Sequence, residues 1–180
     1  MLLSDNQIRK YVKKNDMISP FIERQTNGIS SGLSSYGYDI RVSDNFLVCK
    51  HDDHKYIDPK NFDKSVLKNE NGNLLLPAHG FALGHSVEYL KIPKNIIVIC
   101  MGKSTYARCG LIVHVTPLEP GWEGQVTLEF SNTTSLPVKI YANEGICQLM
   151  FFECDPCEIA YNDRNGKYMK QLGITLPKTR

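Results

Sequence analysis

The run FALGHSVEYLKIPKNIIVICMG at residues 81–102 decides the fold class of this chain. Its two halves, 81–90 and 95–101, are rich in apolar and β-branched residues, and Pro93-Lys94-Asn95 marks a turn between them. The same kind of short apolar run recurs outward from it, at LLLP (74–77), LIVHV (111–115), QVTLEF (125–130), PVKIY (137–141) and ICQLMFF (146–152). Many short strands with little helix between them predict a mostly antiparallel sandwich, jelly roll or distorted β-barrel.

The remaining segments add short elements to this β framework. Ser4 and Gln7 fit a capping box for an N-terminal helix, which the spacing of the following apolar residues supports. The Gly/Ser-rich segment 27–37 is typical of a flexible loop, and the alternation in 36–48 predicts a strand. The polar C-terminal tail, about 161–180, is either a frayed terminus or a lid that orders over a ligand.

The composition fits one globular domain spanning residues 1–180. A net charge of +2 gives no reason to expect nucleic acid or an anionic membrane as a partner. The polar start and the lack of a long apolar run favour a cytoplasmic location.

Cys100, Cys109 and Cys147 stand in apolar contexts, so we expect them to be buried, reduced thiols.

The tetrapeptide Gly102-Lys103-Ser104-Thr105 resembles the end of a phosphate-binding P-loop. That motif needs another glycine five residues before Gly102, and position 97 is isoleucine inside a predicted strand. A P-loop kinase is therefore rejected.

A weaker anion-binding device remains at the same place. Ser104 is expected to cap a short helix that Gly110 ends, and free amides at a helix N-terminus favour anions. Lys103 adds a positive charge, while Ser104 and Arg108 share one helix face because they are four residues apart. On spacing alone, a surface helix with two solvated cations is the simpler interpretation.

The strand QVTLEF carries a lone acid. Val126, Leu128 and Phe130 point to one side and Gln125, Thr127 and Glu129 to the other. If the apolar side faces the core, Glu129 faces solvent or a cleft. If the surface around Glu129 is covered, the loss of water around the carboxylate would raise its pKa toward the range of a general acid and base. His114 could face the same cleft, although a structural, hydrogen-bonded histidine is the simpler role.

No metal site is predicted from the cysteines and histidines. Cys154 and Cys157 form a CxxC pair, but no second pair stands at a suitable spacing for zinc. Zinc nucleobase deaminases carry H-x-E and later P-C-x-x-C. Here His85 and Glu88 are one residue too far apart, and no proline directly precedes Cys154.

Long motifs in the chain are similar to those of a known family. They are GKSTYARCGLIVHVTPLEPGWEGQVTLEFSN (102–132), LPVKIYANEGICQLMFFE (136–153) and YNDRNGKYMKQLGITLP (161–177), extended by SSYGYDIR (34–41), YIDPKNF (56–62) and FALGHSVEYLKIP (81–93). Over nearly its whole length the chain resembles the dCTP deaminases of the dCTP deaminase/dUTPase superfamily.

The resemblance implies a dUTPase-like distorted barrel or jelly roll that assembles as a homotrimer with active sites between subunits. It implies hydrolysis of dCTP to dUTP and ammonia, a step toward dUMP and dTTP. No zinc is expected, and Mg²⁺ is expected to bind through the substrate triphosphate.

The resemblance also implies the roles of individual residues. Glu129 would carry the protons, Ser104 would position the water and Arg108 would stabilise charge and orient Glu129. The full set implied to contact the nucleotide is Lys103, Ser104, Thr105, Tyr106, Ala107, Arg108, Glu119, Thr127, Leu128, Glu129, Gln148, Tyr161, Lys167 and Gln171.

Two alternatives stay open on the sequence alone. The first is a dUTP pyrophosphatase, or a bifunctional enzyme, because these activities share one fold. The second is a nucleotide-binding regulator without catalysis, against which the intact set of Ser104, Arg108 and Glu129 argues.

Overall fold

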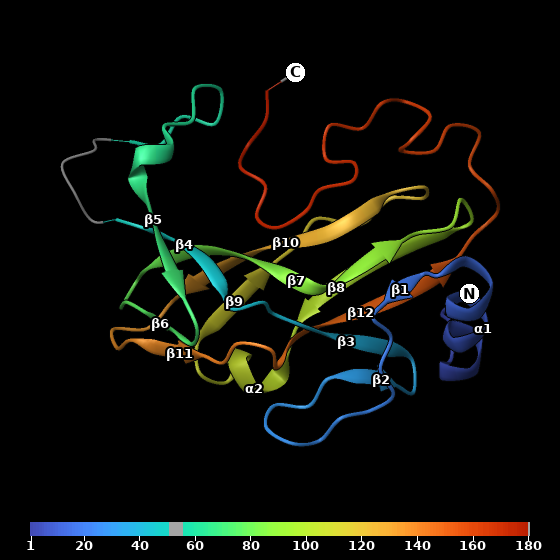
Figure 1. The fold of residues 1–180 in the computed structure, drawn as a ribbon, viewed down its shortest axis with the longest axis horizontal. Coiled ribbons are helices and arrows are strands. Elements are labelled where there is room, and N and C mark those ends of the chain that lie inside the picture. The colour runs from blue at the N-terminus through green and yellow to red at the C-terminus, as the bar shows by residue number, and fades with distance from the viewer. Residues whose placement is uncertain (51–55, 180) are drawn as a thin grey trace.

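The computed structural model describes residues 1–50 and 56–179, and all strand pairs among these residues are antiparallel (Figure 1). The larger sheet has the order β5 (Leu67–Asn71), β4 (Asn45–Cys49), β7 (Phe81–Lys91), β10 (Glu123–Asn132) and β9 (Leu111–His114), with β1 (Ile18–Ser19) also paired to β7. The second sheet has the order β2 (Gly32–Ser34), β3 (Gly37–Arg41), β12 (Gly145–Glu153) and β8 (Ile96–Gly102). A small sheet pairs β6 (Leu74–Leu76) with β11 (Val138–Ile140). The helical segments are α1 (Asp5–Asn15), the 3₁₀ turn η1 (Lys64–Val66) and α2 (Ser104–Ala107).

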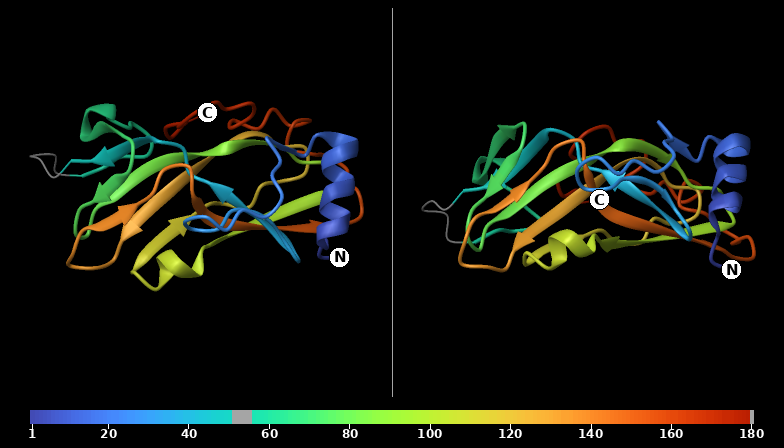
Figure 2. Two further views of the ribbon diagram at one scale, coloured as in Figure 1. Left: turned by 60° about the horizontal axis from the view of Figure 1, so that its bottom comes forward. Right: turned by 90° about the horizontal axis from the view of Figure 1, so that it is seen from below.

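The core lies between the two main sheets, which Figure 2 shows as layers seen from other sides. Leu128 and Phe130 of β10 and Leu149 and Phe151 of β12 are fully buried within it. Because side chains alternate along a strand, the same spacing leaves the other face of β10 free to build a site.

The predicted β architecture is confirmed, and each of the seven apolar runs from residue 74 onward forms a strand. The predicted strand at 36–48 is divided into β3 and β4, and β2 forms within the segment that resembled a loop. Strand β5, with the sequence LKNEN, was not predicted. It pairs with β4 alone, at the edge of the sheet, where a strand needs no apolar face.

Helix α1 begins as predicted, with a capping box in which the Ser4 N–H donates to Gln7 Oε1 at 2.9 Å. The cap of α2 was predicted wrongly. Lys103 is the N-cap, because its backbone is extended and its carbonyl accepts the N–H of Ala107 at 3.0 Å, while Ser104 is already helical. Gly110 follows α2 with a φ of 74°, in the left-handed region that favours glycine.

The prediction of buried cysteines holds for two of the three residues. All six cysteines lie among the described residues and are free thiols. Cys100 and Cys147 are buried, but Cys109 is exposed because it falls in the turn between α2 and Gly110.

The C-terminal segment crosses the outer side of β10 (Figure 1). Gln171 lies beside Gly124, and its carbonyl accepts the Gln125 N–H at 2.9 Å. The Lys170 N–H donates to the carbonyl of Glu123 at 2.8 Å. The segment is therefore tied to the sheet and does not project into solvent.

Candidate active site

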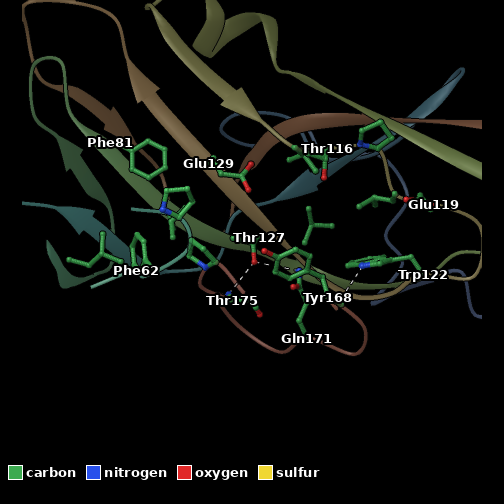
Figure 3. A pocket seen from close by; sticks show the side chains of 18 of the residues that line it. Phe62, Phe81, Thr116, Glu119, Trp122, Thr127, Glu129, Tyr168, Gln171 and Thr175 are labelled. Atoms are coloured by element: carbon green, nitrogen blue, oxygen red, sulfur yellow. Dashed lines mark hydrogen bonds between the residues drawn. The ribbon is translucent and has the colours of Figure 1, made fainter. Parts of the chain in front are cut away.

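A cavity of about 650 Å³ lies between β10 and the C-terminal segment (Figure 3). This volume falls in the range of pockets that take small organic ligands. Its lining comes from segments far apart in the sequence: Cys49, Ile57, Pro59, Phe62, Leu67, Phe81 and Leu83; Val115 to Glu119 and Trp122; Val126, Thr127 and Glu129; and Tyr161, Tyr168, Gln171, Thr175 and Pro177.

Apolar side chains make up most of the cavity lining, with polar ones among them. Figure 3 shows Phe62 and Phe81 on one side of Glu129, and Thr116 and Glu119 on the other. Among the lining residues that the structure describes, none is lysine or arginine. The described part of the lining therefore offers no side-chain cation to a triphosphate group.

The carboxylate of Glu129 points into the cavity, as the alternation of QVTLEF predicted (Figure 3). The side chain is half-buried, and this burial raises its pKa to about 7. The cause is the loss of water around the charged form, which favours the neutral acid. A carboxyl with this pKa can both accept and donate a proton near neutral pH.

Along the edge of β10 next to Glu129, a gap lies between the C-terminal segment and β9. The Gln125 N–H is paired to Gln171 of the C-terminal segment, and Glu129 lies opposite His114 of β9. Main-chain groups two residues apart face the same edge, so those of Thr127 face the gap. The hydroxyl of Thr127 accepts the Thr175 N–H at 3.2 Å. A flat polar ring could therefore pair with the main chain of Thr127.

A buried serine shapes this part of β10. The pairing of β10 with β7 shifts register between Gln125 and Thr127. Ser86 lies in that irregularity, where its hydroxyl donates to the Glu88 carbonyl at 2.6 Å and accepts the Val126 N–H at 2.8 Å. Bulges of this kind redirect side chains beside active sites.

The wall of the cavity is joined to the C-terminal segment. The Nε1–H of Trp122 donates to the carbonyl of Tyr168 at 3.0 Å, and Arg164 forms an ion pair with Glu119. Tyr161 and Gln171 line the cavity, as does Glu119. These three predicted residues are thus brought together with Thr127 and Glu129.

The predicted phosphate-binding turn lies elsewhere. Helix α2 is on the side of the molecule away from the C-terminal segment (Figures 1 and 2). Ser104, Thr105, Ala107 and Arg108 are exposed there, and none of them lines the cavity. The guanidinium of Arg108 donates to the carbonyl of Ser104 at 3.2 Å. A single chain therefore does not unite Ser104 and Arg108 with Glu129.

Four other predicted contacts also lie outside the cavity. Tyr106 and Leu128 are buried in the core, so only their main-chain groups can reach a ligand. The side-chain amide of Gln148 donates to the Ser34 hydroxyl at 3.1 Å, and Lys167 Nζ donates to the Lys178 carbonyl at 3.1 Å.

Lys103 has a partner that sequence reasoning missed. Its Nζ lies 2.6 Å from Oδ2 of Asp39 on β3, and both side chains are largely buried. The one sequence signal was an acid between the apolar residues Tyr38 and Ile40.

The part of the chain that the structure describes has no candidate metal site, because no three of its His, Cys, Asp and Glu side chains are grouped so that they could hold a metal ion. Cys154 and Cys157 are exposed. None of its helices has the length and apolar character needed to cross a membrane.

Solved structures define the class to which this architecture belongs. A 2'-deoxycytidine 5'-triphosphate deaminase from Agrobacterium tumefaciens superposes with a TM-score of 0.64 and 15% identity over 83% of this chain and 46% of that one. The dUTPase of Staphylococcus bacteriophage 80alpha superposes with a TM-score of 0.50 and 11% identity, over 81% and 95% of the two chains. The protein therefore has the dUTPase-like fold.

The sequence comparisons narrow this class to a family. A family model described as dCTP deaminase-like matches residues 2–154. The dCTP deaminase of Azotobacter vinelandii is 56% identical over 184 residues, covering 98% of each chain. That of Rickettsia bellii is 56% identical over 186 residues, covering 99% of each chain. The chain belongs to the dCTP deaminase-like family.

Proposed function

We propose that this protein hydrolyses dCTP to dUTP and ammonia, with Glu129 as the proton carrier. The observation that carries the proposal is the half-buried carboxylate of Glu129, whose pKa burial raises to about 7, inside a cavity large enough for a nucleoside. The identity above 50% to dCTP deaminases over the whole chain supports the choice of substrate.

The chemistry fits one carboxyl group. The carboxylate takes a proton from water as the water oxygen bonds to C4 of cytosine, and it passes that proton to N3. It then moves the proton of the new C4 hydroxyl to the amine, the C4–N bond breaks, and ammonia leaves a C4 carbonyl. Transfer by a positioned group of matched pKa contributes about 10²–10⁴ in rate.

The main chain of Thr127 is proposed to read the base. Its N–H and carbonyl face the gap in the edge of β10, beside the Glu129 carboxylate. A pyrimidine that pairs there would present C4 and N3 to Glu129. A wrong base would leave hydrogen-bonding groups of the site unpaired, and this cost would discriminate strongly against its binding.

A second copy of the chain is proposed to complete the site. The cavity lining contains no cation among its described residues, while Ser104 and Arg108 are exposed on another face. An arginine can bind phosphate oxygens in a bidentate way and neutralise charge at the reacting base. We propose that α2 of one subunit closes the cavity of the next in a homotrimer, as the resemblance implies.

The second sheet offers a surface for this assembly. Ile97, Ile99 and Met101 of β8 and Met150 of β12 point away from the core, and Met101 is 55% exposed. Ile99 and Met150 are opposite each other in the sheet. Exposed apolar clusters of this kind are typical of subunit interfaces.

Mg²⁺ is proposed to arrive on the triphosphate. This ion keeps several waters and is commonly held by substrate phosphates with few protein ligands. A cytoplasmic location is proposed as well, and its support is that the six cysteines are free thiols.

The direct test incubates the purified protein with dCTP or dUTP and Mg²⁺ while ammonia and pyrophosphate are followed together. We expect ammonia from dCTP and pyrophosphate from neither nucleotide. Release of pyrophosphate would favour the dUTPase or bifunctional alternative. Tight binding of dCTP without ammonia would favour the regulator.

A further inference from the structure

A buried acid lies outside the cavity and has no part in the proposed proton transfer. Asp39 is on β3 of the second sheet, and only 5% of its surface is exposed. Its strand neighbours are Gly32 on β2 and Gln148 on β12. A carboxylate at this depth needs a charged or hydrogen-bonding partner to offset the loss of water.

The partner is the first residue of the exposed turn. Lys103 Nζ lies 2.6 Å from Asp39 Oδ2, and the two side chains are 13% and 7% exposed. The main chain of Lys103 is fixed as well, since its N–H donates to the Ile146 carbonyl at 3.2 Å and its carbonyl accepts the Ala107 N–H at 3.0 Å. Lys103 therefore joins the start of α2 to the second sheet at two points, its side chain on Asp39 and its N–H on Ile146.

We propose that Asp39 is a positioning residue for the active site: it holds Lys103 and, through Lys103, fixes the turn that presents Ser104 and Arg108. The inference rests on the proposed function for the role of that turn. In this proposal Lys103 is a tether that anchors the turn to Asp39, and it is not a free cation that reaches the substrate.

The physical reason is the shortness of α2. A helix of four residues has too few hydrogen bonds to hold its own conformation. The Lys103–Asp39 pair and the contact to Ile146 supply the fixed end. Removing the carboxylate leaves a poorly hydrated ammonium group that must move toward water and take the turn with it. A displacement of about 1 Å in a catalytic group can cost about 10²-fold in rate.

A double-mutant cycle tests the tether through activity. The variants are Asp39→Asn, Lys103→Gln, both together, and Lys103→Arg, assayed with dCTP well below their melting temperatures. We expect kcat/KM to fall about 10²-fold in each of the first two and no further in the double variant, because both break one contact. Lys103→Arg keeps a cation on Asp39 and should lose much less activity than Lys103→Gln.

Two outcomes of the cycle would overturn the proposal. One is near wild-type kcat/KM in Asp39→Asn, which would mean that Lys103 acts without Asp39. The other is additive loss, about 10⁴-fold in the double variant, which would mean that the two residues act separately. If Asp39→Asn does not fold, the contrast between Lys103→Gln and Lys103→Arg carries the test, and equal activity of those two variants would overturn the tether.

Amide hydrogen exchange gives a readout without turnover. In Asp39→Asn, amides of residues 103–108 should exchange faster than in the wild type, while those of α1 should not. Lys91→Gln is the matched control, because it breaks an exposed pair in which Lys91 Nζ lies 2.7 Å from Asp16. Unchanged exchange at 103–108 would overturn the tether, whereas a wild-type protein that releases no ammonia would overturn only the proposed function.

Discussion

Arg108 ends α2 outside the cavity into which Glu129 points, so one chain does not bring these two side chains together. The proposed mechanism places both at one base, with the guanidinium beside the carboxylate that would move the protons. The separation is explained if the partner subunit's Arg108 faces Glu129. The same arrangement allows a simple test of the proposed assembly.

Subunit mixing should restore activity to two inactive proteins. Glu129→Gln and Arg108→Gln each remove one half of the site, so each homotrimer should be inactive. When the two chains are refolded together in equal amounts, about a quarter of the sites should combine an intact Glu129 with an intact Arg108 from a neighbour. Ammonia release at about a quarter of the wild-type rate is expected. No recovery in verified mixed trimers would show that the sites are not shared.

Glu129→Gln should separate binding from chemistry. The amide keeps the size of the side chain but cannot carry protons, so the loss in kcat should be at least 10²-fold. dCTP should still bind, because Thr127 and the C-terminal segment are untouched, and calorimetry would measure this. A variant that releases ammonia at near wild-type rate would remove Glu129 from the mechanism.

The same substitution should stabilise the protein at alkaline pH. Glu129 has a pKa of about 7 when folded, above its value of about 4.3 in an unfolded chain. Between these values the folded state binds more protons, so the free energy of unfolding falls as pH rises. Glu129→Gln should therefore melt a few degrees higher at pH 8, with no advantage at pH 4.

That comparison needs two controls. It is made in the Arg108→Gln background, where the cation proposed to face Glu129 from the partner is absent. The exposed Glu158, outside the cavity, serves as a second site, and Glu158→Gln should shift the melting temperature equally at both pH values. A stabilisation by Glu129→Gln that did not depend on pH would contradict the assignment of burial as the cause.

Gly124→Ala should loosen the C-terminal segment. Gly124 has a φ of 148°, and an added Cβ would lie 3.0 Å from atoms of Gln171. The segment should move off β10, which should raise the KM for dCTP on the order of tenfold. Trypsin should also cleave after Lys167 and Lys170 faster than in the wild type.

The matched control for this change is Gly72→Ala. Gly72 also has a positive φ, 81°, but an added Cβ would meet nothing within 4 Å. It should cost stability through backbone strain alone and leave KM and the cleavage rate unchanged. Equal behaviour of the two variants would mean that contact with Gln171 is not what matters at position 124.

Sequence alone determined the features that depend on neighbours along the chain. The alternation in 125–130 placed Glu129 and Thr127 opposite the core, and Ser4 with Gln7 marked the start of α1, because both follow from local backbone periodicity. The long motifs pointed to the family. Strand β5 was not predicted because its polar residues carry no periodic apolar signal, and it forms only through its pairing with β4.

Tertiary structure decided which of these residues meet. It raised the pKa of Glu129 through burial, joined Arg164 to Glu119, and paired Lys103 with Asp39, which is 64 positions away in the chain. It also put the turn of α2 on a different face from the cavity. Such facts depend on how distant segments pack, and no local spacing encodes them.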